Sequence, residues 1–202
     1  MKRIVWAVFL FFLIVPCTSL RAENYYMSPS GDDGNDGTAT TRAWATLQHA
    51  EDIMGAGDTL FIMGGTYSTP QRFHRYTGNG GTPGNPMVFK AYGDDRAIFQ
   101  YTGGGDRQLN RYWYFTSGAD YVVIDGFSYL NPEDSLYIKL EGREDASYLI
   151  RFGGELDGSN WTEHICIKGI EIDGNFPTPD MAYPEGGLMR YALGYTYGRM
   201  DT

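Results

Sequence analysis

The sequence predicts an all-β fold, a right-handed parallel β-helix with three strands per coil and a short N-terminal capping helix. Two observations lead to this prediction. The 202 residues include 27 glycines and 16 tyrosines, a composition typical of β proteins rich in turns. A short pattern of alternating apolar residues also recurs along the chain, as expected for the stacked coils of a solenoid.

The recurring pattern reads apolar, any residue, apolar, polar or Met, small, any residue. It begins at Leu60, Met87, Val122 and Ile165, with spacings of 27, 35 and 43 residues. Its first and third positions are apolar, as on a strand face that packs against a core. Its fifth position is Gly or Ala, which suits a bend where the strand leaves its sheet.

We therefore expect the four repeated segments to lie side by side as parallel strands of one sheet. Their inward residues are expected to be Ile62, Phe89, Ile124 and Ile167. Two further sets of strands are expected between them: residues 98–101 and 136–140 in one set, and residues 72–76, 112–115 and 148–152 in the other. Parallel crossover connections are nearly always right-handed, which predicts a right-handed β-helix.

One helix is expected before the first repeat, at residues 46–54. Thr46 can cap its start and Gly55 can end it. The residues expected to share its apolar face are Leu47, Ala50, Ile53 and Met54. We expect residues 23–56 to form an N-terminal cap segment that covers the first coil.

Residues 57–202 are expected to form the first coils of the β-helix. The last repeated strand ends near Ile172, and a Gly- and Tyr-rich tail follows it, with residues 188–191 as one more candidate strand. Solenoids usually close with a capping element, and this tail offers no long amphipathic helix. The sequence therefore predicts an incomplete solenoid, truncated at its C-terminal end.

The N-terminal residues predict a secretory signal peptide, residues 1–22. Two basic residues precede twelve uninterrupted apolar residues, 4–15, and a more polar stretch ends at Ala22. The apolar run is shorter than the roughly 20 residues that a membrane-spanning helix needs. We therefore expect a secreted, extracytoplasmic protein that begins at Glu23 and has no membrane span, with lipidation of Cys17 as the alternative.

Charge limits the classes of partner. Cleavage would remove Lys2, Arg3 and Arg21, so that 13 of the 16 basic residues remain against 25 acidic ones, a net charge of −12. Nucleic acid and anionic membranes are therefore not expected as partners. Cys166 would be the single cysteine left, so no internal disulfide is expected.

A succession of short motifs links residues 25–173 to a known group of proteins. The motifs are YYMSPSG (25–31), NDGT (35–38), WATLQ (44–48), GDTL (57–60), GGTY (64–67), GNPM (84–87) and KAY (90–92). They resemble the N-terminal region of secreted bacterial right-handed β-helix proteins of the pectate-lyase-like superfamily. The family-nine polysaccharide lyases are the enzymes of this group that the motifs resemble.

This resemblance implies that the parent protein cleaves an acidic polysaccharide by β-elimination. In these lyases calcium binds and acidifies the uronate, and a Lys or Arg removes the proton. Their catalytic groups lie on later coils, so the catalytic residues stay unknown and none is carried over to this chain. The alternative is a non-catalytic surface, adhesion or glycan-binding module, because the same opening occurs in β-helix proteins without catalysis.

Lys90, Asp125 and Lys168 occupy the same position of successive repeats. In stacked parallel strands they would lie about 4.8 Å apart. One interpretation is a ladder of ion pairs on the outer face, with a modest effect on stability. The other is that Lys90 and Lys168 bind an acidic sugar.

Three further candidates come from residue type and spacing. Asp120 and Glu163 each precede a repeated strand by two residues, so a stacked pair of carboxylates could bind calcium or act as acid and base. Trp113 could stack on a sugar ring, although alternation places part of its segment in the core. The acidic loop at residues 32–36 misses the EF-hand pattern and predicts an Asx turn instead of a calcium site.

Overall fold

The computed structural model describes residues 21–68, 71, 73–75, 80–100, 113–116, 119–130, 138–141, 150–153, 164–173 and 193–196. Over these residues the chain is mostly β, with one short α-helix and one 3-10 turn, η1 (Thr40–Arg42). The strands form a seven-stranded and a four-stranded sheet, and their pairings are parallel. The predicted signal peptide, apart from its last two residues, lies outside the described residues.

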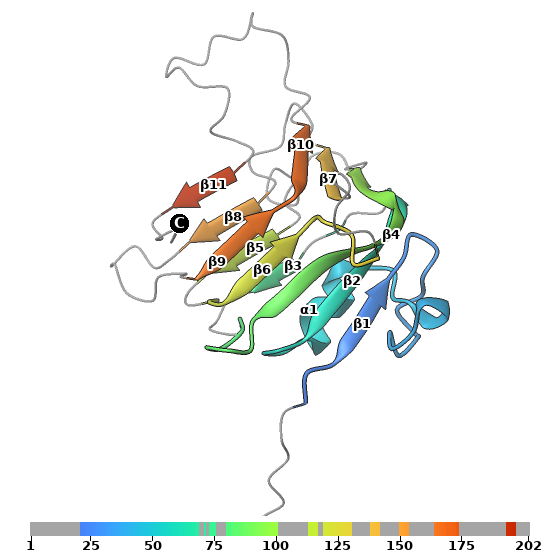
Figure 1. Cartoon of the computed structure of the whole chain (residues 1–202), viewed down its shortest axis with the longest axis horizontal. Helices are drawn as coiled ribbons and strands as arrows, with labels where there is room; N and C mark the ends of the chain where they lie inside the picture. The colour runs from blue at the N-terminus through green and yellow to red at the C-terminus, as the bar shows by residue number, and fades with distance from the viewer. Residues whose placement is uncertain are drawn as a thin grey trace, which may run out of the picture.

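The strands fall into three series (Figure 1). The first series has the order β1 (Asn24–Met27), β2 (Thr59–Tyr67), β4 (Met87–Gln100), β6 (Val122–Asp125), β9 (Ile165–Lys168). In the second series, the C-terminal part of β4 pairs with β7 (Ile138–Glu141), which pairs with β10 (Ile170–Asp173). The third series is the four-stranded sheet, with the order β3 (Phe73–Arg75), β5 (Trp113–Thr116), β8 (Ile150–Gly153), β11 (Leu193–Thr196). The prediction that the four repeated segments form neighbouring parallel strands is confirmed.

The register agrees with the sequence alignment in all but the first repeat. Met87 pairs with Val122, and Val122 pairs with Ile165, as predicted. Leu60, however, pairs with Phe89 instead of Met87. The shift is two residues, and side chains alternate with a period of two, so the same residues still face the core.

The inward positions form the core. Ile62, Phe89 and Ile124 have no exposed surface, and Ile167 is partly buried against the same cluster. Phe89 of the first series meets Phe73 of the third series edge to face, with ring centroids 4.8 Å apart. The three series therefore bury their inward side chains against one another.

Small residues allow the close approaches between strands. A β-carbon on Gly126 would lie 1.8 Å from the Gly169 carbonyl oxygen, and one on Gly64 would lie 2.5 Å from the Asp95 carbonyl oxygen. The pairing of β2 with β4 is irregular between Met63 and Gly65, where the chain passes from the first series to the second. The bend predicted at the small residue of the repeat is thus present there.

The helix α1 (Leu47–Ile53) begins as predicted, since the Thr46 hydroxyl accepts a hydrogen bond of 3.1 Å from the His49 amide. Leu47 is buried, but Ile53 is 44% exposed and so departs from the predicted apolar face. At 100° per residue, Ile53 lies about 120° around the helix from Leu47. The helix packs against β3, the first strand of the four-stranded sheet.

The final strand β11 lies two residues beyond the candidate strand at 188–191. Residues 188–191 themselves lie outside the described residues. Among the residues that are described, no helix has the length and apolar character needed to cross a membrane.

Candidate functional site

One row of side chains crosses the outer face of the first series. Strand register pairs Tyr26 with Phe61, Phe61 with Lys90, Lys90 with Asp125, and Asp125 with Lys168. We call these five residues the outer row. With neighbouring strands about 4.8 Å apart, the row is roughly 19 Å long.

The charged half of the outer row is an ion-pair ladder. The Lys90 Nζ lies 2.6 Å from the Asp125 Oδ2, and the Lys168 Nζ lies 3.2 Å from the same oxygen. The Lys90 Nζ also donates to the Phe127 carbonyl oxygen at 3.2 Å. The predicted ladder is therefore confirmed, and its three charged groups sum to +1.

The two lysines differ in how far they remain available to a ligand. The Lys90 side chain is 20% exposed, whereas that of Lys168 is 51% exposed. Burial raises the pKa of the Asp125 carboxyl, but hydrogen bonds from Lys90, the Phe127 amide and Lys168 outweigh burial and hold this pKa below its ordinary value. Asp125 therefore stays ionised and holds both ammonium groups, with Lys168 open to solvent.

Four rings gather at the other end of the outer row. We call Tyr26, Phe61, Tyr92 and Tyr129 the aromatic cluster. Tyr129 meets Phe61 with ring centroids 4.9 Å apart and stacks on Tyr92 at 6.0 Å and 11°. Tyr26 stacks on Phe61 at 5.3 Å and meets Tyr92 edge to face, also at 5.3 Å. The cluster thus joins rings from β1, β2, β4 and the segment after β6.

Tyr129 is the exposed member of the aromatic cluster, with 56% of its surface accessible. Its backbone amide donates to the Ala91 carbonyl oxygen at 2.8 Å. The preceding Ser128 hydroxyl donates to the Gly93 carbonyl oxygen at 2.6 Å. These bonds position the ring against β4, so a ligand would meet an aromatic surface that is already in place.

The tyrosine hydroxyls of the cluster can act as neutral hydrogen-bond donors. Burial, followed by the neighbouring Tyr92 and Tyr129, raises the pKa of Tyr26. Tyr26 therefore remains protonated at neutral pH and can both donate and accept.

A second aromatic contact lies where β6 and β9 begin. Tyr121 and His164 directly precede these strands and have positive φ angles of 55° and 57°. Their rings stack with centroids 4.3 Å apart and an interplanar angle of 6°. The same unusual backbone conformation therefore recurs in successive repeats, a feature that the residue types alone do not indicate.

The other sequence candidates are placed differently. Trp113 has no exposed surface and packs against Phe99 with ring centroids 5.4 Å apart. The suggestion that Trp113 stacks on a sugar is therefore wrong. Trp113 occupies an inward position of its strand, so its side chain lies in the core. Asp120 is half-buried beside Tyr121, but Glu163 lies outside the described residues, so their predicted pairing stays a prediction.

The acidic loop forms the predicted Asx turn, because the Asp32 Oδ1 accepts the Gly34 amide at 2.8 Å. The neighbouring Asp33 carboxylate accepts the amides of Ala45 and Thr46 at 2.8 and 3.0 Å. These oxygens are thus engaged in joining the loop to the start of α1. Within the described part of the chain, no three His, Cys, Asp or Glu side chains form a group suited to a metal ion.

The second series carries a different set of charges that sequence reasoning did not identify. Arg96 pairs with Glu171, and the Lys139 Nζ lies 3.0 Å from the Glu141 carboxylate and 3.8 Å from that of Glu171. We call these four residues the charged network. Register could have revealed it, since Lys139 pairs with Glu171 in neighbouring strands.

No protein-family model matches this chain. The chain is 34% identical over 73 residues to the uncharacterized protein YwoF of Bacillus subtilis (strain 168), a match that covers 36% of this chain and 14% of YwoF. The chain therefore matches only a small part of that relative's length.

Two solved structures are similar to part of this chain. A rhamnogalacturonan lyase is similar at a TM-score of 0.44 and 19% identity, covering 71% of this chain and 36% of the lyase. The GH136 lacto-N-biosidase from Eubacterium ramulus is similar at a TM-score of 0.49 and 13% identity, covering 75% of this chain and 34% of that enzyme. Both are carbohydrate-active enzymes.

Proposed function

We propose that this chain is exported, forms coils of a right-handed parallel β-helix, and binds an acidic glycan across its outer row. The observation that carries the binding proposal is the juxtaposition of an exposed ring, Tyr129, with an exposed ammonium group, Lys168, on one face of the sheet.

The order in which the chain visits the three series supports the β-helix. β6, β7 and β8 belong to the first, second and third series, and β9, β10 and β11 repeat that order. Each strand pairs in parallel with its counterpart from the neighbouring repeat. Parallel crossovers are right-handed in about 98% of cases, which supports the proposed hand.

The aromatic cluster suits the apolar face of a sugar ring. Aromatic side chains offer a large apolar surface, and the tyrosine hydroxyls add a polar edge for sugar hydroxyl groups. Tyr129 rests on Phe61 and Tyr92, so its ring is supported from beneath while much of it stays accessible. Preorganisation of this kind lowers the entropic cost of binding.

The charges of the outer row favour an acidic glycan over a neutral one. Lys90 and Lys168 share the single carboxylate of Asp125, which leaves an excess of one positive charge. Three strand spacings, about 14 Å, separate the Phe61 position from that of Lys168. A glycan chain that stacks on the aromatic cluster could therefore place a carboxylate near Lys168, where a charge-assisted hydrogen bond would form.

Calorimetric titration with polygalacturonate, and with neutral galactan for comparison, tests this proposal. Tyr129→Ala should weaken polygalacturonate binding about tenfold, or ~1.4 kcal/mol. Lys168→Ala should weaken it by a similar factor and leave any galactan binding unchanged. Arg42→Ala is the matched control, because it removes an exposed cation from the cap segment. Wild-type affinity in both Tyr129→Ala and Lys168→Ala would refute the proposed site.

An absorbance assay of the same protein with polygalacturonate can separate the two classes of function. Ultraviolet absorbance from an unsaturated product would favour the lyase activity that the sequence resemblance implies. Binding without product would favour the non-catalytic module. Calcium-assisted elimination remains a prediction from the resemblance, since the described residues do not supply a fitting set of calcium ligands.

A further inference from the structure

A carboxylate at the start of β2 is buried and faces the backbone nitrogen of Glu23. Asp58 is only 7% exposed. Its Oδ1 accepts a hydrogen bond of 2.9 Å from the Glu23 nitrogen, and its Oδ2 accepts one of 2.7 Å from the Gly55 amide. Two neutral amides therefore hold a carboxylate that has lost most of its contact with water.

This carboxylate has no cationic side chain beside it in the described part of the chain. None of the lysines, arginines or histidines described there lies within the 4.0 Å ion-pair distance of Asp58. Buried charges in proteins are normally paired, because desolvation without a counter-charge is costly. Asp58 is thus a buried carboxylate that, among the described residues, lacks a positive charge beside it.

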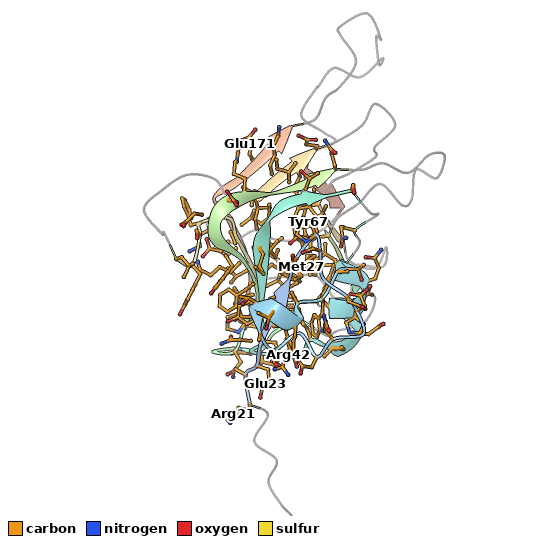
Figure 2. The ribbon with its side chains drawn as sticks, turned by 90° about the vertical axis from the view of Figure 1, so that its right-hand side faces the viewer. Arg21, Glu23, Met27, Arg42, Tyr67 and Glu171 are labelled. Atoms are coloured by element: carbon orange, nitrogen blue, oxygen red, sulfur yellow. The ribbon has the colours of Figure 1, made fainter. Side chains whose placement is uncertain are left out.

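Backbone hydrogen bonds of Glu23 and Asp58 hold the Glu23 nitrogen in place beside the Asp58 carboxylate. The Glu23 carbonyl oxygen accepts a 2.9 Å hydrogen bond from the Thr59 amide, and the next residue, Asn24, begins β1. The Asp58 carbonyl oxygen accepts the Val88 amide at 2.9 Å, which joins this turn to β4. Figure 2 shows Glu23 at one end of the ribbon, next to Arg21, where the described chain begins.

We infer that Asp58 is a receptor for the α-ammonium group that export processing creates at Glu23. The sequence pattern puts signal-peptide cleavage between Ala22 and Glu23, and the atom that becomes the ammonium nitrogen is the atom that already contacts Asp58. Hydrolysis of that peptide bond consumes one water, releases the leader with a carboxylate at Ala22, and leaves Glu23 with a protonated amine. A neutral hydrogen bond then becomes a buried ion pair that anchors β1 to the sheet.

This inference rests on the export part of the proposed function and is independent of glycan binding. Among the described residues, the ionisable groups that act on one another at this place are the carboxyl groups of Asp58 and Glu23 and the hydroxyl group of Tyr25. Burial, followed by the charges of Asp58 and Glu23, raises the pKa of Tyr25. Tyr25 is therefore neutral in the range where an α-amine titrates, and Asp58 is the partner closest to the nitrogen.

The first experiment is the intact mass of the chain exported from a bacterial host with its own leader. A mass that corresponds to residues 23–202 is expected. A different first residue, or a lipid on Cys17, would overturn the inference and the predicted cleavage together. The mass therefore tests the processing step by itself, and the ion pair is tested by the second experiment.

The second experiment compares two forms of the chain, one that begins at Glu23 and one that begins at Ala22. In the longer form the Glu23 nitrogen stays a neutral amide with the contact already described. The shorter form should melt roughly 2–6 °C higher at pH 7, because a charged hydrogen bond is stronger than a neutral one. The pairing should also raise the α-amine pKa of Glu23 by about one unit above its ordinary value near 8, as measured by NMR titration.

The pH dependence has a defined sign. An amine whose pKa is raised by folding stabilises the folded chain below its unfolded pKa, and the contribution is lost as pH rises through the folded pKa. The difference in melting temperature should therefore shrink above about pH 8–9. Asp58→Asn should abolish the pKa shift. The Ala22 form of wild type should still fold, since its Glu23 nitrogen keeps the neutral hydrogen bond to Asp58. Equal melting temperatures and an ordinary α-amine pKa in the Glu23 form would overturn the inference.

Discussion

The outer row of the first series and the charged network of the second series are built in the same way but differ in chemistry. In both, successive parallel strands bring side chains into register on a face that points away from the core. The outer row combines two lysines, one carboxylate and supporting aromatic rings, with an excess positive charge. The charged network balances two cations against two carboxylates.

Burial also separates the two regions. The side chain of Asp125 is 8% exposed, whereas those of Glu141 and Glu171 are 25% and 37% exposed. Ion pairs in contact with water contribute little to stability, but removal of one partner from a buried pair leaves a charge without compensation. Side chains in register are therefore not enough to form a candidate binding site. The outer row also has an unbalanced charge and an aromatic surface, whereas the charged network has neither.

The largest effect is expected in the core that supports both regions. Ile124 has no exposed surface, so Ile124→Asp would bury an unpaired charge and should abolish soluble expression. The neighbouring Val123 points to the outer face and is partly exposed, so Val123→Asp is the matched control and should remain folded. Soluble yield and thermal unfolding measure the contrast. Normal thermal stability in Ile124→Asp would contradict the described core.

A smaller effect is expected when the ladder loses its carboxylate. Asp125→Asn leaves Lys90 and Lys168 to repel each other across one strand, with no negative charge between them. We expect a loss of about 2 kcal/mol, or roughly 4–8 °C in melting temperature. Denaturant unfolding gives the free energy directly. If Asp125→Asn were as stable as wild type, the ion pairs of Asp125 would contribute as little to stability as exposed ion pairs do.

The pH dependence of the ladder isolates the part of this effect that is due to charge. Since the pKa of Asp125 is lower in the folded chain than its unfolded value near 3.9, its contribution is present above that value. The contribution is lost as pH falls through the folded pKa. The stability gap between wild type and Asp125→Asn should therefore be constant from about pH 7 to 5 and close below about pH 4. A gap that persists in strong acid would show that the variant disturbs packing instead.

The smallest effect is expected in the charged network. Glu171→Gln removes a partner of Arg96 and Lys139, but the side chain is more than a third exposed and the Lys139–Glu141 pair remains. We expect a change of about 0.5 kcal/mol or less, reduced further by salt. If Glu171→Gln cost as much as Asp125→Asn, burial would not explain the difference between the two regions.

Many features of the fold follow from short-range patterns in the sequence. Alternation of apolar residues identified the inward positions at Ile62, Phe89 and Ile124, because a strand has a fixed period of two. The shared position of Lys90, Asp125 and Lys168 in successive repeats was enough to predict their ladder. Thr46 was identified as a helix cap because its hydroxyl acts on the local backbone.

The tertiary structure decided the features that depend on which segments meet. Alternation did not say which face of its strand Trp113 would occupy, and the three-series core turned it inward. Tyr129 contacts Phe61 and Tyr92, and so completes a cluster whose first ring, Tyr26, lies 103 residues earlier in the sequence. It does so from a turn that no periodic pattern describes. The sequence by itself determined the repeated strands of the first series, their inward faces and the ladder, because these follow from local periodicity. The aromatic cluster and the contact between Glu23 and Asp58 arose only in three dimensions, since each depends on the path of the chain between distant residues.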